Sequence, residues 1–132
     1  MATNPLRVFL VEDAKHLQDV LGELLTSIGN FAVVGTAASE AEAIHWLDTH
    51  GNEWDLLVAD LILDQGTGLG VVAKCRHRAP ANKVVVLSDY VTPGIHRHCL
   101  ALGADAAMSK SDMPAFLDYC RGLNSDGAVG NT

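Results

Sequence analysis

Hydrophobic residues along this chain follow two alternating patterns: short unbroken apolar runs, and longer segments with an apolar residue every three or four positions. The first run, at residues 7–11, is rich in β-branched and aromatic side chains and predicts a strand. The apolar residues between positions 17 and 28 then recur at the spacing of an amphipathic helix. This pair of patterns occurs five times in succession, with strands expected at residues 7–11, 31–35, 55–59, 83–87 and 104–108, each followed by a helix.

Two of the expected strands, at residues 55–59 and 83–87, are apolar at every position after the first. A strand without polar alternation is usually buried on both faces, as in a parallel sheet covered by helices. Five strand–helix units in a row therefore predict the α/β class. The expected architecture is a flavodoxin-like, doubly wound fold with a five-stranded parallel sheet in the order 2-1-3-4-5 and five helices.

The patterns also indicate where the domain and one of its helices begin and end. Ser39, followed by Glu42 three residues later, forms the capping box that is typical of a helix start. The apolar periodicity stops before Asn124, and the residues that follow are mostly small or polar. We therefore expect one domain at residues 1–123 and a disordered tail at residues 124–132.

Composition disfavours several classes of partner. The 16 acidic and 9 basic residues give a formal net charge of −7, which leaves no excess of cations to displace the counterions of a nucleic acid. No apolar run approaches the roughly 20 residues of a membrane-spanning helix, and the N-terminus lacks a signal-peptide pattern, so a cytoplasmic location without a membrane partner is expected. Cys75, Cys99 and Cys120 form no Cys-x-x-Cys pair and are expected to be buried free thiols.

Side chains capable of chemistry follow four of the five expected strands. They are Glu12 and Asp13 after the first strand, Asp60 after the third, Ser88 after the fourth and Lys110 after the fifth. Ligands of open α/β sheets bind at the carboxyl ends of the strands, so these side chains are expected to converge on one edge. Taken singly, Asp13 could instead cap a helix and Glu12 could be solvated. Asp60 interrupts an apolar run, where an acid is costly to bury unless a cation or hydrogen bonds compensate.

Three neighbouring carboxylates repel one another, so a divalent cation is their natural partner. Oxygen ligands suit Mg²⁺, which keeps some of its waters and bridges to phosphoryl oxygens. A carboxylate can also act as a nucleophile and form an aspartyl phosphate. In that chemistry Lys110 would pair with the product, and Ser88 would donate to a phosphoryl oxygen.

In this set of residues the sequence resembles the response regulator receiver domain of two-component signalling, over about residues 6–123. The matching features are the acidic pair Glu12-Asp13, the phosphoacceptor Asp60, the switch hydroxyl Ser88, the lysine Lys110, the loop that ends at Gly68, and the turn Gly103-Ala-Asp105. The resemblance implies a Mg²⁺ site formed by Glu12, Asp13, Asp60 and the main-chain carbonyl of Ile62.

Four positions depart from the pattern of that family. Asp64 and Ser111 stand where proline is common, and neither change affects the chemistry. Ala107 replaces the aromatic residue that usually rotates on activation, and Asp89 replaces a small neutral residue after the switch hydroxyl. We hypothesise that the signal is relayed instead by Tyr90 and its loop, with Asp89 favouring the unphosphorylated position of that loop.

The expected function is that of a single-domain response regulator with no enzymatic activity beyond its own phosphorylation and slow hydrolysis. It would take a phosphoryl group from a sensor histidine kinase or a histidine phosphotransfer protein, as part of a phosphorelay, and signal to an unknown downstream protein as a monomer or weak homodimer. One alternative is a pseudo-receiver that binds protein without carrying phosphate, which Asp89 and Ala107 favour. Another is a metal-dependent phosphatase with an aspartyl nucleophile, although such enzymes usually carry a second acid where this chain has Ile62.

Overall fold

The structure, a computed structural model, describes residues 4–130 and the side chains of residues 4–124. Its centre is a sheet of five parallel strands, in which the neighbours follow the order β2-β1-β3-β4-β5. The strands are β1 (Leu6–Val11), β2 (Phe31–Ala37), β3 (Leu56–Ala59), β4 (Lys83–Ser88) and β5 (Ala106–Ser109). The predicted fold class and strand order are therefore confirmed.

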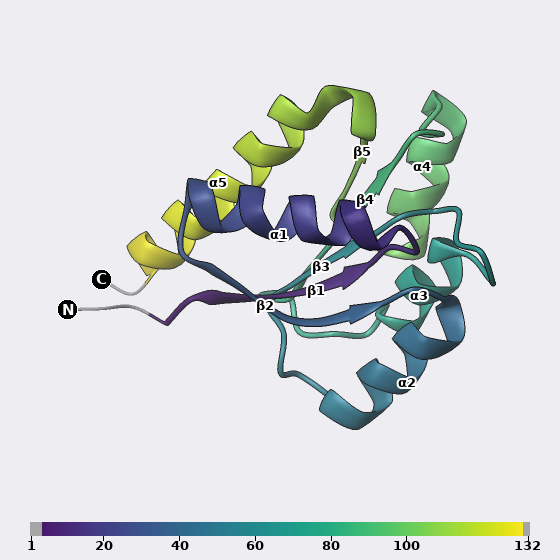
Figure 1. Ribbon diagram of the computed structural model, residues 1–132, viewed down its shortest axis with the longest axis horizontal. Coiled ribbons are helices and arrows are strands. Elements are labelled where there is room, and N and C mark those ends of the chain that lie inside the picture. Colours follow the sequence, from purple (N-terminus) through teal and green to yellow (C-terminus); the bar gives the residue numbers. More distant parts are fainter. Residues whose placement is uncertain (1–3, 131–132) are drawn as a thin grey trace.

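Five α-helices and one short 3₁₀ helix connect and cover the strands. They are α1 (Lys15–Ile28), α2 (Glu40–His50), α3 (Gly68–Lys74), α4 (Pro93–Leu102), the 3₁₀ helix η1 (Lys110–Asp112) and α5 (Met113–Gly130). Helices α1 and α5 lie on one face of the sheet, and α2, α3 and α4 lie on the other (Figure 1). Among the residues that the structure describes, no helix is both long and apolar enough to cross a membrane.

The alternation of side chains along each strand separates the core into two layers. In β1, Val8 and Leu10 pack toward α1 and α5, whereas Phe9 and Val11 pack toward α2 and α3. The same division runs through β3 and β4, whose apolar residues are buried on both faces. The unbroken apolar runs thus arise because helices cover both sides of the sheet. The three cysteines lie in these layers as buried free thiols, as predicted.

Ser39 caps α2 as predicted, but the reciprocal bond of the expected capping box goes to Ala38, one residue before the cap, instead of to Ser39. The main-chain N–H of Glu42 donates to Ser39 Oγ at 3.2 Å, and the Glu42 carboxylate in turn accepts from the main-chain N–H of Ala38 at 3.2 Å. One main-chain donor that the helix start leaves unpaired, the N–H of Glu42, is thereby satisfied, and the Glu42 carboxylate holds the residue before the cap.

The disordered tail expected at residues 124–132 stays a prediction, although the first of these residues, Asn124, makes defined contacts. Helix α5 continues through Gly130, while residues 131 and 132 lie outside the described part of the chain. The side-chain amide of Asn124 makes two hydrogen bonds to the main chain of Asn30. It accepts from the Asn30 N–H at 3.1 Å and donates to the Asn30 carbonyl at 3.2 Å. This contact joins α5 to the turn before β2, a link between distant segments that hydrophobic periodicity does not indicate.

Candidate functional site

The sheet register brings the predicted site residues to the same edge. Val11 pairs with Ala59, so Glu12 and Asp60 follow neighbouring positions of β1 and β3. The N–H of Asp60 donates to the carbonyl of Val11 at 3.0 Å and continues the ladder past the end of β3. On the other side, Ser88 of β4 pairs with Ser109 of β5, which places Lys110 one residue beyond the same edge.

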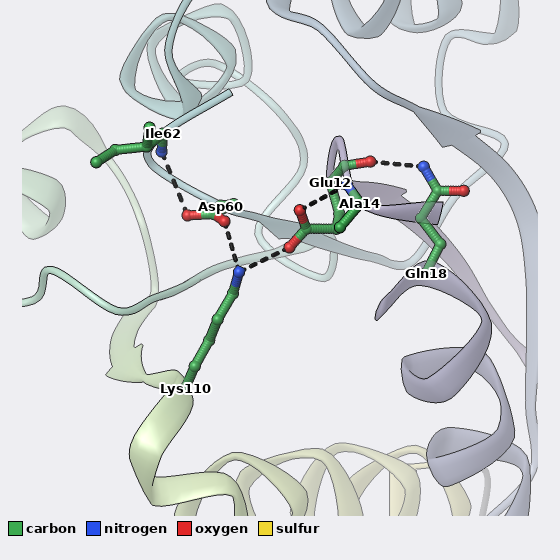
Figure 2. A network of polar contacts seen from close by, with 6 residues as sticks. All are labelled: Glu12, Ala14, Gln18, Asp60, Ile62 and Lys110. Carbon is green, nitrogen blue, oxygen red and sulfur yellow. Dashed lines mark hydrogen bonds and ion pairs between the residues drawn. The ribbon is translucent and has the colours of Figure 1, made fainter. Parts of the chain in front are cut away.

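Lys110 joins the carboxylates of two strands. Its Nζ lies 2.8 Å from Glu12 Oε1 and 2.6 Å from Asp60 Oδ2, as Figure 2 shows. Only 4% of the Glu12 side chain and 9% of the Asp60 side chain are exposed, against 17% for Lys110. Burying these carboxylates is tolerated because a cation and further hydrogen bonds accompany them.

The remaining carboxylate oxygens are held by the main chain next to each acid. Asp60 Oδ1 accepts from the N–H of Ile62 at 3.3 Å, and Glu12 Oε2 accepts from the N–H of Ala14 at 3.0 Å (Figure 2). The buried amide of Gln18 donates from Nε2 to the main-chain carbonyl of Glu12 at 2.5 Å, which fixes the end of β1. The sequence analysis did not identify Gln18 as part of the site. The available signal is that this polar residue directly follows Leu17, which belongs to the apolar stripe of α1.

Asp13 completes an acidic cluster rather than capping α1. The residue before α1 is Ala14, which makes no side-chain cap, and Asp13 is half-buried. One carboxylate oxygen from each of Glu12, Asp13 and Asp60 lies within 4.8 Å of the other two. Three carboxylate oxygens at this separation form a donor set that fits a hard divalent cation such as Mg²⁺.

The charges of the cluster shift one another's pKa values. Burial raises the pKa of Glu12 despite its bond to Lys110. For Lys110, burial lowers the pKa, but the bonds to Asp60 and Glu12 outweigh it and the net direction is upward. Hydrogen bonding with the Glu12 carboxyl, and to a smaller extent with the Asp64 carboxyl, lowers the pKa of Asp13. The same contact with Asp13 raises the pKa of Asp64. Asp64, which the sequence shows only as a departure from a family pattern, thus lies beside the cluster.

Ser88 lies at the end of β4 and is fully buried. Among the side chains that the structure describes, its Oγ is one of two buried polar atoms without a hydrogen-bond partner. A buried hydroxyl without a partner is costly, and most such groups in proteins are satisfied. Its Oγ therefore keeps an unused hydrogen-bonding capacity at the end of β4.

The three residues of the hypothesised relay lie beyond the cluster. Asp89 and Tyr90 are exposed in the segment between β4 and α4, and 59% of Tyr90 is accessible. Ala107 is buried in β5 and borders a hollow of about 340 Å³, which Val91 and Pro93 also line. The small side chain at this position leaves open space between α4 and β5.

Gly68, where the loop after Asp60 ends, lies directly against the phosphoacceptor predicted from the sequence. The N–H of Gly68 donates to the carbonyl of Leu61 at 2.9 Å. A Cβ at this position would overlap the carbonyl oxygen of Asp60 and lie 2.8 Å from its carbonyl carbon. Glycine is therefore required here for space, and it allows α3 to begin in contact with the acidic residue.

A family model of the response regulator receiver domain matches residues 8–119. The chain belongs to this family. Receiver domains are the phosphoryl-accepting modules of two-component signal transduction, and this chain is one of them. Receiver domains bind Mg²⁺ through an acidic pocket, and the cluster of Glu12, Asp13 and Asp60 lies at the edge where the resemblance implies that pocket.

Relatives and solved structures agree with this assignment. The chain is 28% identical over 105 residues to the uncharacterized transcriptional regulatory protein YvfU of Bacillus subtilis, covering 80% of this chain and 52% of the relative. It is 26% identical over 107 residues to the response regulator protein VraR of Staphylococcus saprophyticus, covering 81% and 50%. This receiver domain therefore spans about half the length of these curated relatives.

Two solved structures show the same fold at low sequence identity. The response regulator domain of Thermotoga maritima CheB has a TM-score of 0.78 at 22% identity, over 92% of this chain and 98% of that one. A CheX-CheY-BeF3-Mg²⁺ complex from Borrelia burgdorferi has a TM-score of 0.74 at 22% identity, over 81% and 79%. At these identities the comparison supports the architecture alone.

Proposed function

We propose that this receiver domain accepts a phosphoryl group on Asp60 from a phosphohistidine donor, in a Mg²⁺-dependent reaction, and signals by altered protein binding. The observation that carries the proposal is the Lys110 amine bridging the buried carboxylates of Asp60 and Glu12. A lysine in this place neutralises charge on the acceptor and would pair with the phosphoryl oxygens of the product.

The proposed transfer forms one bond and breaks one. A carboxylate oxygen of Asp60 attacks phosphorus, and the P–N bond of the donor phosphohistidine breaks, so the electron pair of that bond leaves with the imidazole nitrogen. Asp60 is oriented for this attack by its bonds to Lys110 and to the N–H of Ile62. The buried Ser88 hydroxyl would donate to one oxygen of the arriving group.

Mg²⁺ would be held by Glu12, Asp13 and Asp60, with the Ile62 carbonyl as the main-chain ligand that the family resemblance implies. When bound, the ion neutralises the carboxylates and the charge of the incoming phosphoryl group. The family model over residues 8–119 and the acidic cluster are the grounds for proposing this ion, since receiver domains bind Mg²⁺ through an acidic pocket.

The proposed donors are a sensor histidine kinase or a histidine phosphotransfer protein, and the proposed recipient of the signal is a downstream protein. We further propose that the domain works in the cytoplasm, as a monomer or weak homodimer. Neither a nucleic acid nor a membrane is proposed as a partner, since the net charge of −7 disfavours attraction to polyanions.

Phosphoryl uptake is tested directly by incubating the protein with acetyl phosphate and Mg²⁺ and measuring its intact mass. The expected result is a mass increase of one phosphoryl group in the presence of Mg²⁺. No such increase is expected when the incubation contains a chelator in place of Mg²⁺. No mass increase under these conditions would contradict the proposal and favour the pseudo-receiver alternative.

Mg²⁺ binding is expected to depend on Asp13. Replacing Asp13 with alanine removes one of the three carboxylates and should weaken Mg²⁺ binding about tenfold or more, since the site supplies few protein ligands. Mg²⁺ titration followed by amide NMR shifts measures the affinity, with Asp19→Ala, an exposed acid of α1, as the control. Equal affinities of the Asp13→Ala and wild-type proteins would remove Asp13 from the proposed site.

Tyr90 is proposed to relay the signal, because Ala107 cannot rotate as an aromatic side chain would. Tyr90 lies two residues after Ser88 and three before Pro93, the first residue of α4. A movement of the Ser88 hydroxyl toward the phosphoryl group would therefore shift this loop. In the unphosphorylated position of the loop, the exposed Asp89 would repel the incoming phosphate. Beryllofluoride, a phosphoryl mimic, should shift the α4 amides in NMR spectra of the wild type and much less in Tyr90→Ala. Equal shifts in both proteins would exclude Tyr90 as the relay.

A further inference from the structure

Glu40, in the first turn of α2, contacts the loop that follows Asp60. Its Oε1 accepts from the main-chain N–H of Thr67 at 2.8 Å. Its own N–H donates to the carbonyl of Gln65 at 3.1 Å. The residue thus joins α2 to the β3–α3 loop through both its side chain and its main chain.

That loop is connected in turn to Asp60. Thr67 and Ile62 form an isolated antiparallel bridge across the loop. The N–H of Ile62 donates to Asp60 Oδ1 at 3.3 Å. A short series of contacts therefore runs from the Glu40 carboxylate through Thr67 and Ile62 to the acceptor oxygen.

The glycines of the loop leave room for the Glu40 side chain. A Cβ on Gly66 would overlap Glu40 Cβ and lie 2.8 Å from its Oε1. A Cβ on Gly70 would overlap its Oε2 and lie 2.5 Å from its Cδ. Gly66 also has a φ of +84°, which side-chain-bearing residues rarely adopt, so the loop is shaped around Glu40. Gly66 and Gly70 thus leave room for Glu40, whereas Gly68 between them lies against the Asp60 carbonyl.

We propose that Glu40 is a positioning residue for phosphoryl transfer, which holds the β3–α3 loop so that the main chain of Ile62 remains against Asp60. The inference rests on the proposed acceptor role of Asp60. Losing the carboxylate would release Thr67 and loosen the Ile62 N–H from the acceptor oxygen. Small displacements of positioning groups of this kind reduce rates by one to two orders of magnitude.

The chain offers a matched control for this role. Glu42 is the other acidic residue in the first turn of α2, and its carboxylate bonds to Ala38 of the same segment instead of the loop. Alanine at either position removes one carboxylate and one hydrogen bond from the same helix start. Only Glu40→Ala removes a side-chain contact with the β3–α3 loop, while the main-chain bond from the Glu40 N–H to the Gln65 carbonyl remains. Glu40→Gln keeps an oxygen that can accept from Thr67 and serves as the conservative variant.

The test compares the initial rate of phosphorylation by acetyl phosphate in the wild type and the three variants, at saturating Mg²⁺ and measured by intact mass. Glu40→Ala is expected to react about tenfold more slowly. Glu42→Ala and Glu40→Gln are expected within about twofold of the wild type. A wild-type rate in Glu40→Ala, or equal losses in the two alanine variants, would overturn the proposal, because equal losses would mean that only the helix start matters.

Amide hydrogen exchange separates this proposal from the proposed function. The Ile62 and Thr67 amides are expected to exchange about tenfold faster in Glu40→Ala than in Glu42→Ala, with no phosphoryl donor present. If the wild type takes up no phosphoryl group, the proposed function fails while these exchange rates still decide whether Glu40 holds the loop. Equal exchange in the two alanine variants would overturn the role of Glu40 even if the wild type is phosphorylated.

Discussion

Asp60→Asn is expected to abolish phosphoryl uptake while leaving the protein folded. The amide has nearly the shape of the carboxylate but is not a nucleophile towards phosphorus, so no aspartyl phosphate can form. Lys110 keeps its bond to Glu12 at 2.8 Å, so the substitution does not leave the buried ammonium without a partner. The expected loss in intact-mass assays with acetyl phosphate and Mg²⁺ is at least about a hundredfold, which amounts to no detectable product.

The matched control for this experiment is Asp89→Asn. Asp89 is exposed and lies one residue after Ser88, so the control makes the same chemical change next to the site without touching the carboxylate cluster. It should retain phosphorylation at the wild-type rate or faster, because the exposed acid proposed to repel phosphate is neutralised. Circular dichroism should show the same secondary structure in both variants. If the Asp60→Asn variant still forms a phosphoryl adduct, another side chain is the acceptor and the assignment of Asp60 is wrong.

The strand order and the location of the site could be predicted because both depend on local patterns. Continuous apolar runs such as that of β4 arise only where helices cover both faces of a sheet. The acidic and basic residues immediately follow those runs, and parallel strands end at one edge, so with the common strand order 2-1-3-4-5 a site containing Glu12, Asp60 and Lys110 is expected.

Contacts between side chains on different loops could not be predicted in this way. The bond from Glu40 to Thr67 depends on how the β2–α2 and β3–α3 loops approach one another, and no periodicity encodes that approach. The same holds for Asn124, which bonds to Asn30 and lies in a helix that continues past the expected end of the domain. A polar contact with a distant turn, such as that of Asn124, leaves no apolar periodicity in the sequence from which it could be predicted.

Gly68 belongs to a motif that is visible in the sequence, but the sequence does not show why glycine is required at this position. The sequence shows only a glycine eight residues after Asp60, which is consistent with a flexible turn. The structure gives a steric reason, because Gly68 is buried with its Cα against the carbonyl group of Asp60. Its φ is not among the positive values found at Gly51, Gly66 and Gly103, so space rather than backbone conformation requires glycine here.

Gly68→Ala is accordingly expected to destabilise the protein and to disturb the acceptor. The added methyl group would lie 2.8 Å from the carbonyl carbon of Asp60 and 3.1 Å from Leu61 Cα, and these main-chain atoms cannot rotate away as a side chain could. Overpacking of this kind costs about 3 kcal/mol, which corresponds to a fall of about 10 °C in melting temperature for a chain of this size. Relief of the clash by moving α3 would displace Asp60, so phosphorylation should fall with stability.

Gly94→Ala is the control that separates a steric effect from the general effect of alanine in a helix. Gly94 lies in the first turn of α4, where a Cβ would meet nothing closer than Arg97 Nη2 at 3.8 Å. Alanine there is expected to change stability by no more than about 1 kcal/mol, in the stabilising direction if the helix propensity dominates. Thermal unfolding followed by circular dichroism measures both variants. If Gly68→Ala melts at the temperature of Gly94→Ala, the main chain around Asp60 has room for a methyl group, and the proposed contact between α3 and the acceptor does not constrain the site.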